Sequence, residues 1–440
     1  MKIVLITFVT PCSENVRGTS ALPYHLIKGI NLAQAHLHNK VINASTTIYT
    51  FNNNRLSKEK VKEVEQELGV TIKQIPLPKW YLWMFKLHLL FLRVFLKYPF
   101  VNYIKLPQRY MAEIKNHNPD LIWVMGEELS RIARQFPNFQ RIHIGPDTES
   151  LYYYRMIGQR FVMNNVFDYW KCAIMYRKYA RMEREFPPDE NYTYLAVGEE
   201  DVRHLRQLNP KVKTKFLRHP HYDVNPNVNP NPNVNHNSYT IKFHQPKIKL
   251  LIAGRYDLYM KQEGDLLVER LVANANLNLN PNPNLNLNAN PNSNGNRNDD
   301  FLRSHYSITF LGKGWEKHVK ELQDSGWEVN HITFAPDYIE EICKHDIQIT
   351  PITIGTGTKG KVLDALANGL LVIGTPYAME NIAVVNGVSC IEYRYPKEVI
   401  DILHDIPINR EKYETMAREG QKSVLEYHDR SLLSKKLFSL

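Results

Sequence analysis

Short apolar runs alternate with stretches of helical periodicity along most of this chain. In the first half the apolar runs lie at Lys2–Val9, Thr46–Phe51, Leu121–Met125, Arg141–Ile144 and Thr193–Val197. Helical patterns such as Leu56–Leu68 lie between them. The second half repeats the arrangement, with apolar runs at Ile248–Ala253, Ser307–Leu311, Glu328–Phe334, Ile347–Ile352 and Leu371–Ile373. The alternation predicts an α/β protein with two Rossmann-like, doubly wound domains that face a cleft lined by the carboxyl ends of their strands.

Two Asn-rich tracts interrupt this pattern. From Asn225 to Asn237 and from Asn274 to Asn298 every second residue is Asn. Proline recurs between the asparagines and removes the backbone donors that a strand needs. We therefore expect two disordered inserts without chemistry, with a sticky Asn-rich interaction tract as the alternative.

The same signals set the domain boundaries. A chain of 440 residues exceeds what one compact core accommodates, so two domains are expected. Residues 1–222 form the predicted N-terminal Rossmann-like domain, 223–246 an Asn/Pro-rich linker, and 247–408 the C-terminal domain with a disordered insert at 274–300. Residues 409–440 are predicted to be helical and to cross back to the N-terminal domain.

Charge and cysteine content indicate which kind of partner and which cellular compartment to expect. The formal net charge of +10 favours an anionic partner such as a nucleotide, a phospholipid or a nucleic acid. Four scattered cysteines fit neither a disulfide framework nor the spacing of a metal site, so we expect a reducing compartment and no structural zinc. The run Lys2–Val9 is interpreted as a buried first strand, with a signal peptide as the alternative. Since no segment offers roughly 18 uncharged apolar residues, no membrane span is expected.

Residues 349–374, ITPITIGTGTKGKVLDALANGLLVIG, read as a strand, a Gly-rich turn, a helix and a second strand. Gly355 and Gly357 allow the backbone to leave the strand sharply and to approach a ligand closely. Thr358 is a candidate N-cap, and the amides at the helix start then point outward, where they can bind an anion. Positive charge at a helix N-terminus is unfavourable without an anionic ligand. Two lysines stand there, Lys359 and Lys361. The turn therefore predicts a phosphate site.

Asp364 lies one turn into that helix. At about 100° per residue it shares a face with Lys361 and Asn368, opposite the apolar positions. A carboxylate one turn from a phosphate site can accept both hydroxyls of a ribose. We expect a polar Lys–Asp–Asn stripe that faces a nucleotide; the alternative is a capped surface helix with an intrahelical Lys–Asp pair. The motif is not a Walker loop, because the Gly-Lys-Ser/Thr ending is absent.

The segment PITIGTGTKGKVLDALANGLLVIGTPYAMENI resembles the nucleotide-diphosphate segment of family 4 (group 1) glycosyltransferases of the GT-B fold. Three further segments are similar to that family: KLLIAGRYDLYMKQEG, ITFLGKG and HITFAPDYIEEICKHDIQITPI. The resemblance covers most of the C-terminal half. The N-terminal half resembles the family mainly through its first strand, Gly18 and the order of its elements.

The resemblance implies a role for each matching residue. Arg255 and Lys261 would neutralise the diphosphate of a nucleotide sugar, and the amides after the second glycine of the turn would hold the distal phosphate. Asp364 stands where the family has a ribose-binding Glu, and Lys359 and Lys361 match basic positions of the turn.

Two positions depart from the family pattern. Thr356 stands where the family often has a second acid that contacts the transferred sugar, although some relatives with a Gly-x-Gly-Thr turn dispense with that acid. The domain junction reads HPHYD (His219–Asp223) in place of the family's Pro-Asn-Gly-Val-Asp.

The implied activity is transfer of a sugar from a nucleotide-diphosphate sugar to a glycan or lipid-linked acceptor, in cell-surface polysaccharide or glycolipid synthesis. The resemblance implies retention of the anomeric configuration. No paired-acid metal motif lies outside the Asn-rich insert, so we expect neither a metal nor another cofactor. Two alternatives stay open. One is a GT-B-type sugar-nucleotide epimerase or hydrolase, and the other, because of Thr356, is a degenerate domain that assists glycan assembly.

The N-terminal domain is expected to hold the acceptor. Gly18, after the first strand, would let chain or ligand pass closely. His143 and Asp147 lie at and after another strand end and could contact the acceptor or the donor sugar. The alternatives are a strand residue packed against a helix for His143 and a helix cap for Asp147. Weaker candidates follow the run LIWVMG, namely Glu127 and Glu128.

The stretch from Lys79 to Lys115 carries seven Lys or Arg against one acid, Glu113, with aromatic residues interleaved. A basic, aromatic-rich helix that is too charged to span a bilayer can lie in its interface. We therefore expect Trp80–Lys97 to contact an anionic membrane surface, which would make the protein cytoplasmic and peripheral to the membrane. A core helix with basic ends is the alternative. Nucleic acid is not expected, since the aromatic residues are mixed with Leu and Met.

Overall fold

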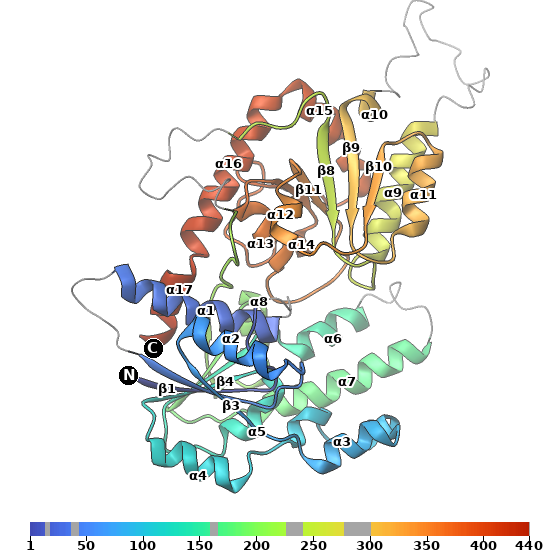
Figure 1. The fold of residues 1–440 in the computed structure, drawn as a ribbon. Coiled ribbons are helices and arrows are strands. Elements are labelled where there is room, and N and C mark those ends of the chain that lie inside the picture. The colour runs from blue at the N-terminus through green and yellow to red at the C-terminus, as the bar shows by residue number, and fades with distance from the viewer. Residues whose placement is uncertain (14–17, 37–43, 159–165, 226–240, 277–300, 440) are drawn as a thin grey trace, which may run out of the picture. The chain divides into compact units, whose positions relative to one another are not determined.

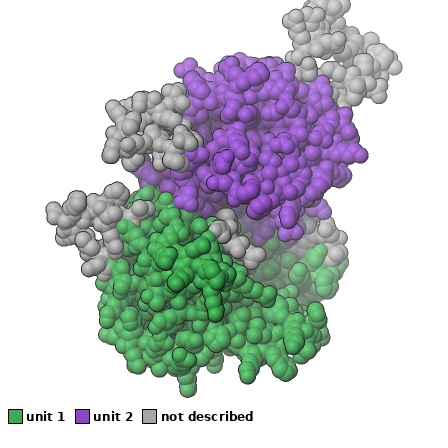
Figure 2. All heavy atoms as spheres, in the orientation of Figure 1, with its two compact units in different colours: residues 1–220, 356–358, 428–440 green, residues 221–355, 359–427 purple. Residues whose placement is uncertain are grey.

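The computed structural model describes residues 1–13, 18–36, 44–158, 166–225, 241–276 and 301–439. The chain divides into two compact units (Figure 2). Unit 1 comprises residues 1–220, 356–358 and 428–440, and unit 2 comprises residues 221–355 and 359–427. Most of the two predicted Asn-rich inserts lies outside the described residues. Of their ends, Asn225 is described, and residues 274–276 complete a helix.

Unit 1 is built on a seven-stranded parallel sheet (Figure 1). The strand order is β3-β2-β1-β4-β5-β6-β7. Successive side chains of β1 enter opposite layers, with Val4 in one apolar cluster and Ile3 in the other, because a strand alternates its faces. The strands are β1 Lys2–Thr7, β2 Ser45–Thr50, β3 Thr71–Gln74, β4 Leu121–Met125, β5 Arg141–Gly145, β6 Tyr192–Ala196 and β7 Lys213–Phe216.

Helices connect these strands. The α-helices are α1 Gly18–His36, α2 Lys58–Leu68, α3 Lys79–Lys86, α4 Gln108–His117, α5 Ser130–Ala133, α6 Glu149–Gly158, α7 Val166–Arg184 and α8 Glu199–Leu208. Three 3-10 helices are η1 Leu89–Phe95, η2 Phe100–Tyr103 and η3 Glu127–Leu129.

The last helix of the chain also belongs to unit 1. This helix, α17 (Arg430–Phe438), packs on α1 (Figure 1). The Ser434 hydroxyl donates to the Leu26 carbonyl at 2.6 Å. Gly29 allows the close approach, since a Cβ there would collide with the Arg430 backbone. The segment predicted to cross back, 409–440, therefore divides: α16 (Arg410–Tyr427) belongs to unit 2 and α17 to unit 1.

Unit 2 has a six-stranded parallel sheet of order β10-β9-β8-β11-β12-β13, with one large apolar core. Its strands are β8 Ile248–Ala253, β9 Tyr306–Leu311, β10 Val329–Ile332, β11 Ile347–Thr350, β12 Leu371–Gly374 and β13 Ile391–Glu392. Its helices besides α16 are α9 Lys261–Asn276, α10 Phe301–His305, α11 Glu316–Asp324, α12 Tyr338–Ile342, α13 Gly360–Ala367, α14 Pro376–Met379 and α15 Pro396–Ile408.

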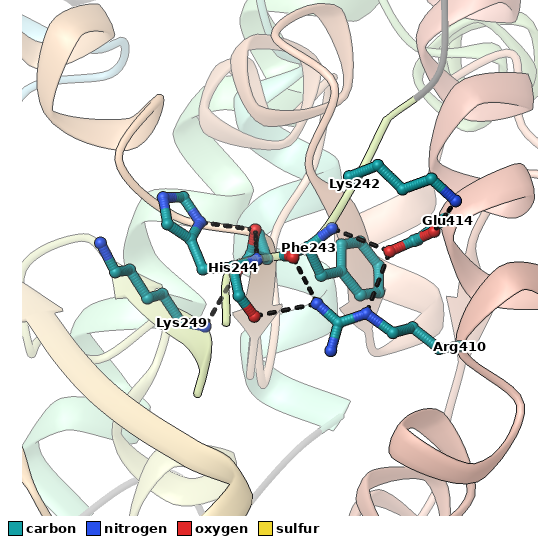
Figure 3. A network of polar contacts seen from close by, with 7 residues as sticks. Lys242, Phe243, His244, Lys249, Arg410 and Glu414 are labelled. Atoms are coloured by element: carbon teal, nitrogen blue, oxygen red, sulfur yellow. Dashed lines mark hydrogen bonds and ion pairs between the residues drawn. The ribbon is translucent and has the colours of Figure 1, made fainter. Parts of the chain in front are cut away.

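A polar network ties the segment before β8 to α16 (Figure 3). Glu414, which is buried, accepts hydrogen bonds from the Lys242 ammonium, the Phe243 amide and the Arg410 guanidinium, each within 3.1 Å. Burial pushes the pKa of Glu414 upward, but these hydrogen bonds together hold it below its ordinary value. His244 donates its amide to Asp346 at 3.0 Å. The network therefore anchors the start of the unit 2 sheet to the C-terminal helices.

The ten predicted strands are all present, within a few residues of their predicted ends. Three short strands were missed: β3, β7 and β13. Each lies at an edge of its sheet, and β3 and β7 have polar residues at most positions, so no apolar run marks them.

The predicted helix Trp80–Lys97 is wrong as a single element. α3 ends at Lys86, His88 adopts a left-handed conformation with φ 54°, and a 3-10 helix follows. Of the residues in α3 and η1 only Tyr81 is buried, which excludes the core-helix alternative. Among the described helices none is long and apolar enough to cross a bilayer.

Candidate active site

The basic residues singled out in the C-terminal half follow two adjacent strands of unit 2. β8 and β11 pair with each other, and the chain leaves β8 toward β9 but leaves β11 toward β12. Such a switch in strand order opens a crevice at the carboxyl ends, which is the usual ligand site in open α/β sheets. The loop after β8 carries Arg255 and leads to Lys261 in α9, while the loop after β11 carries Gly355 and leads to α13.

Hydrogen bonds hold these two loops together. The Thr353 amide donates to the Tyr259 carbonyl at 2.7 Å, and the Thr353 hydroxyl accepts from the Glu263 amide at 3.1 Å. The Lys361 ammonium reaches under the first loop, 3.4 Å from the Ala253 carbonyl. Gly254 is needed there, because its φ is +125° and a Cβ would collide with that ammonium. The two loops therefore form one basic surface.

The surroundings of Lys361 disfavour the charged form of its side chain. Burial lowers its pKa to about 8; Asp257 opposes the shift and Lys359 adds to it. Arg255 and Lys261, in contrast, are exposed to solvent. A doubly charged phosphate group beside these cations would offset the cost of keeping Lys361 protonated. The electrostatics therefore favour an anionic ligand at this surface.

The Gly-rich turn departs from its prediction at Thr358. α13 begins at Gly360 with Lys359 as its N-cap residue, and the Lys359 side chain makes no capping hydrogen bond. Residues 356–358 group with unit 1, where the Thr358 hydroxyl donates to the Val197 carbonyl at 2.7 Å and the Gly357 amide donates to Asp201 at 3.2 Å. Gly357 has a φ of +62°, which explains glycine at that position.

Asp364 is buried, with 2% of its surface exposed. Burial raises its pKa to about 8; a hydrogen bond from the Tyr222 backbone opposes the shift and Asp223 adds to it. One carboxyl oxygen, Oδ1, has no hydrogen-bond partner among the described residues. A buried polar atom without a partner costs about 1–3 kcal/mol, so this oxygen is available to a ligand that donates a hydrogen bond.

A second unpartnered polar atom lies nearby. The Tyr338 hydroxyl at the start of α12 also lacks a hydrogen-bond partner within the described chain, and Asp364 raises the pKa of this tyrosine further beyond the effect of burial. Sequence reasoning missed Tyr338. The Asp337 N-cap places it at the helix start, but nothing in the sequence indicates that it faces Asp364.

The Lys–Asp–Asn stripe predicted on α13 differs from the structure at Asn368, which bonds to the chain itself. Asn368 is buried, like Asp364, and it joins α13 to the segment that enters unit 2. Its side chain donates to the Asp364 carbonyl at 2.8 Å and accepts from the Asn225 amide at 2.9 Å. The alternative, a surface helix with a Lys–Asp pair, is also wrong, because Lys361 turns toward the loop after β8. The segment that enters unit 2 therefore covers the Asn368 end of the polar face of α13.

Two candidate residues of unit 1, Gly18 and His143, contact other parts of the same unit. Gly18 begins α1, and a Cβ there would lie 3.1 Å from Pro146, so the prediction of a close approach holds for the chain itself. His143 is fully buried. Its Nδ1 lies 2.6 Å from the Tyr192 hydroxyl and its Nε2 lies 2.8 Å from the Gly126 carbonyl, and burial lowers its pKa to about 4. This corrects the expectation that His143 faces the cleft and matches the packed strand residue.

Carboxyl groups gather at the ends of β4 and β5. Asp147 is half-buried, and the Thr356 hydroxyl lies 3.5 Å from it. Glu127 is buried and accepts from the Glu149 amide at 3.1 Å; burial and the charge of Glu183 raise its pKa well above the ordinary range. Burial raises the pKa of Glu149 to about 8. Burial therefore disfavours the charged form of Glu127 and of Glu149 and raises the pKa of both.

The fold of this chain is similar to that of several solved structures. No family model matches the sequence, and no curated protein matches it. Solved structures do: HepE of Anabaena in complex with UDP has a TM-score of 0.58 at 13% identity, over 100% of this chain and 99% of HepE. Sucrose-phosphate synthase of Thermosynechococcus elongatus has a TM-score of 0.60 at 12% identity, over 100% and 97%. WaaG, a glycosyltransferase involved in lipopolysaccharide biosynthesis, has a TM-score of 0.53 at 14% identity, over 99% and 98%.

At this level of identity the similarity shows the fold, with its two parallel α/β domains. That fold is the one shared by these GT-B glycosyltransferases, and the predicted fold class is confirmed.

Proposed function

We propose that this chain transfers a sugar from a nucleotide-diphosphate sugar to the hydroxyl of an acceptor. The observation that carries the proposal is the basic surface at the switch point of unit 2, together with the buried carboxyl of Asp364 and its unpartnered oxygen. One protein of similar fold supports the choice of donor, because HepE was solved with UDP and with UDP-glucose. The sucrose-phosphate synthase supports transfer as the reaction.

Each residue of the surface has a part in the proposed complex. Arg255 and Lys261 neutralise the diphosphate, and Lys359 and Lys361 bind the same group from the Gly-rich turn. The Asp364 carboxyl accepts from the ribose hydroxyls. A charge-assisted hydrogen bond to phosphate contributes about 1.5–3 kcal/mol, so a few such contacts account for micromolar binding.

In the proposed reaction the leaving group is the nucleoside diphosphate. The bond between the anomeric carbon and the diphosphate oxygen breaks, and its electron pair stays on that oxygen. The acceptor oxygen bonds to the anomeric carbon on the same face, and its proton passes to the departing phosphate. The cations of the site stabilise the charge that develops, and this stabilisation replaces a metal ion. His143 takes no part, since it is buried in the sheet.

We also propose that the acceptor is a glycan or a lipid-linked glycan on a membrane surface, in cell-surface polysaccharide or glycolipid synthesis. The exposed aromatic and basic residues of α3 and η1 support this placement. Trp83 is 63% exposed and Phe91 is 64% exposed, and a soluble surface seldom carries such residues together.

A ligand panel tests the donor assignment. UDP-, GDP-, ADP- and CMP-sugars are added to the purified chain, and the melting temperature is measured. A donor at about 100 times its dissociation constant should stabilise the protein by about 2.7 kcal/mol. The stabilising donor is then incubated with and without acceptor glycans. Donor consumption without acceptor would favour the hydrolase or epimerase alternative, and no shift with any nucleotide sugar would favour the degenerate domain.

A further inference from the structure

An apolar groove of about 690 Å³ lies on unit 1, whereas the residues assigned to the donor belong to unit 2. Its lining includes Trp80, Trp83 and Met84 of α3, Leu89 of η1, and Leu96, which directly follows η1. The side chains that line it are aromatic or aliphatic except for Lys79. The glycosyl-transfer reaction proposed above gives this groove no role.

Packed aromatic rings adjoin the residues that line the groove. Tyr81 is buried in the unit 1 core and stacks on Phe100, with ring centroids 5.1 Å apart and planes at 20°. Trp80 meets Phe100 edge to face at 5.3 Å. Tyr98, also buried, donates its hydroxyl to Glu185 at 2.6 Å. The groove is therefore preformed by packed aromatic rings, which lowers the entropic cost of binding.

Basic side chains in and beside the groove indicate a ligand with an anionic group. Lys79 stands in the lining, and Lys86 and Arg93 follow in the same two elements. Within the described chain these three side chains form no ion pair, and no acid occurs in the sequence between Lys79 and Glu113. A ligand that fits this arrangement has an anionic head and an unbranched apolar tail.

We propose that the groove binds one acyl chain of an anionic membrane lipid, with the lipid phosphate at Lys79. This is more specific than adsorption to a bilayer surface, because a single chain leaves the lipid layer and enters the protein. That the bound lipid belongs to the acceptor rests on the function proposed above; the binding itself does not.

Alkyl phosphates from hexyl to tetradecyl, kept below their micellar concentrations, test the groove without a bilayer. Trp80 and Trp83 report binding through their fluorescence. Affinity should rise about fourfold per methylene group, as burial of a CH2 predicts, and then stop rising once the groove is full. An affinity that rises steadily over the whole series would indicate surface adsorption and overturn the proposal, as would no binding at all.

Matched variants distinguish ligand binding in the groove from ligand binding on the exposed surface. Met84→Glu places a charge in the groove, while Phe95→Glu places the same charge at a residue that is 82% exposed and does not line it. We expect at least a tenfold loss of dodecyl phosphate binding in Met84→Glu and less than twofold in Phe95→Glu. Equal losses, or a larger loss in Phe95→Glu, would contradict the proposal. Lys79→Gln should weaken dodecyl phosphate more than dodecyl glucoside, and equal weakening would remove Lys79 from the site.

The donor site and the lipid groove can be tested separately. The melting-temperature shift caused by the nucleotide sugar should be the same in Met84→Glu as in the wild type, because the groove and the donor residues lie in different units. A variant that keeps the donor shift is folded, so its loss of alkyl phosphate binding then reports the groove.

Discussion

Replacing Asp364 with Asn should make the protein more stable and its donor site weaker. The carboxyl is buried, and its pKa rises from the ordinary 3.8 to about 8. At neutral pH the unfolded chain gains free energy by ionising this group, whereas the folded chain keeps it protonated. Each pH unit between the two pKa values contributes 1.36 kcal/mol, so the native Asp costs about 4 kcal/mol of stability at pH 7.

Asparagine removes most of that cost because it cannot ionise. Its amide needs hydrogen-bond partners of its own, and a buried amide without them costs about 1–3 kcal/mol. We therefore expect a net gain of about 1–3 kcal/mol at pH 7. For a unit of this size that corresponds to a rise in melting temperature of roughly 3–10 °C.

The difference in stability between the wild type and Asp364→Asn should depend on pH. The folded pKa of an acid is raised here, so its penalty is absent below pH 3.8, grows as pH rises, and becomes constant above about 8. Melting curves of both proteins from pH 5 to pH 9 should diverge up to that point and then run parallel. If Asp364→Asn is equally or less stable at every pH, the carboxyl has a partner that keeps it ionised in the folded protein and does not lower its stability.

The same variant tests the ribose contact. Asparagine offers one acceptor oxygen, whereas the Asp364 carboxyl offers two once it gives up its proton to bind both ribose hydroxyls, so the nucleotide diphosphate should bind about tenfold more weakly, a loss of about 1.4 kcal/mol. A 2′,3′-dideoxy nucleotide is the control, because it lacks the hydroxyls and should bind both proteins equally. Loss of affinity for both nucleotides alike would indicate a distorted site.

The remaining predictions concern the cations, the polar network and the membrane. Arg255→Ala and Lys261→Ala should each weaken donor binding or turnover by about 2 kcal/mol without lowering the melting temperature, and steady-state kinetics within threefold of wild type in both would remove the diphosphate assignment. Glu414→Gln should destabilise unit 2 by about 1–3 kcal/mol at pH 7. The native pKa of Glu414 is depressed, so its stabilisation is present above the ordinary 4.5 and is lost as pH falls below it; the two proteins should converge in acid unfolding. Purified protein should sediment with anionic vesicles at about 50 mM salt and be released at high salt, since the attraction is screened beyond the Debye length. Binding that is insensitive to salt would contradict a basic membrane face.

Much of the fold could be predicted from the sequence, because its signals are local. A strand buried on both faces needs a continuous apolar run, and the predicted runs became strands of two parallel sheets. The edge strands β3 and β7 carry no such run, because an edge strand can leave polar residues in solvent. The positions of Arg255 and Lys261 after β8 follow from the same local reading, since a loop must follow each strand end.

The environment of each site residue was decided by the tertiary structure. Periodicity shows that α13 has an apolar and a polar face, but it cannot show what covers the polar one. The segment that enters unit 2 packs on that face, and its amides at Tyr222 and Asn225 bond to Asp364 and Asn368. That packing buries the Asp364 carboxyl and raises its pKa, and Oδ1 has no hydrogen-bond partner in the described part of the chain. Long-range contacts of this kind join residues more than 100 positions apart, and no pattern within a helix encodes them.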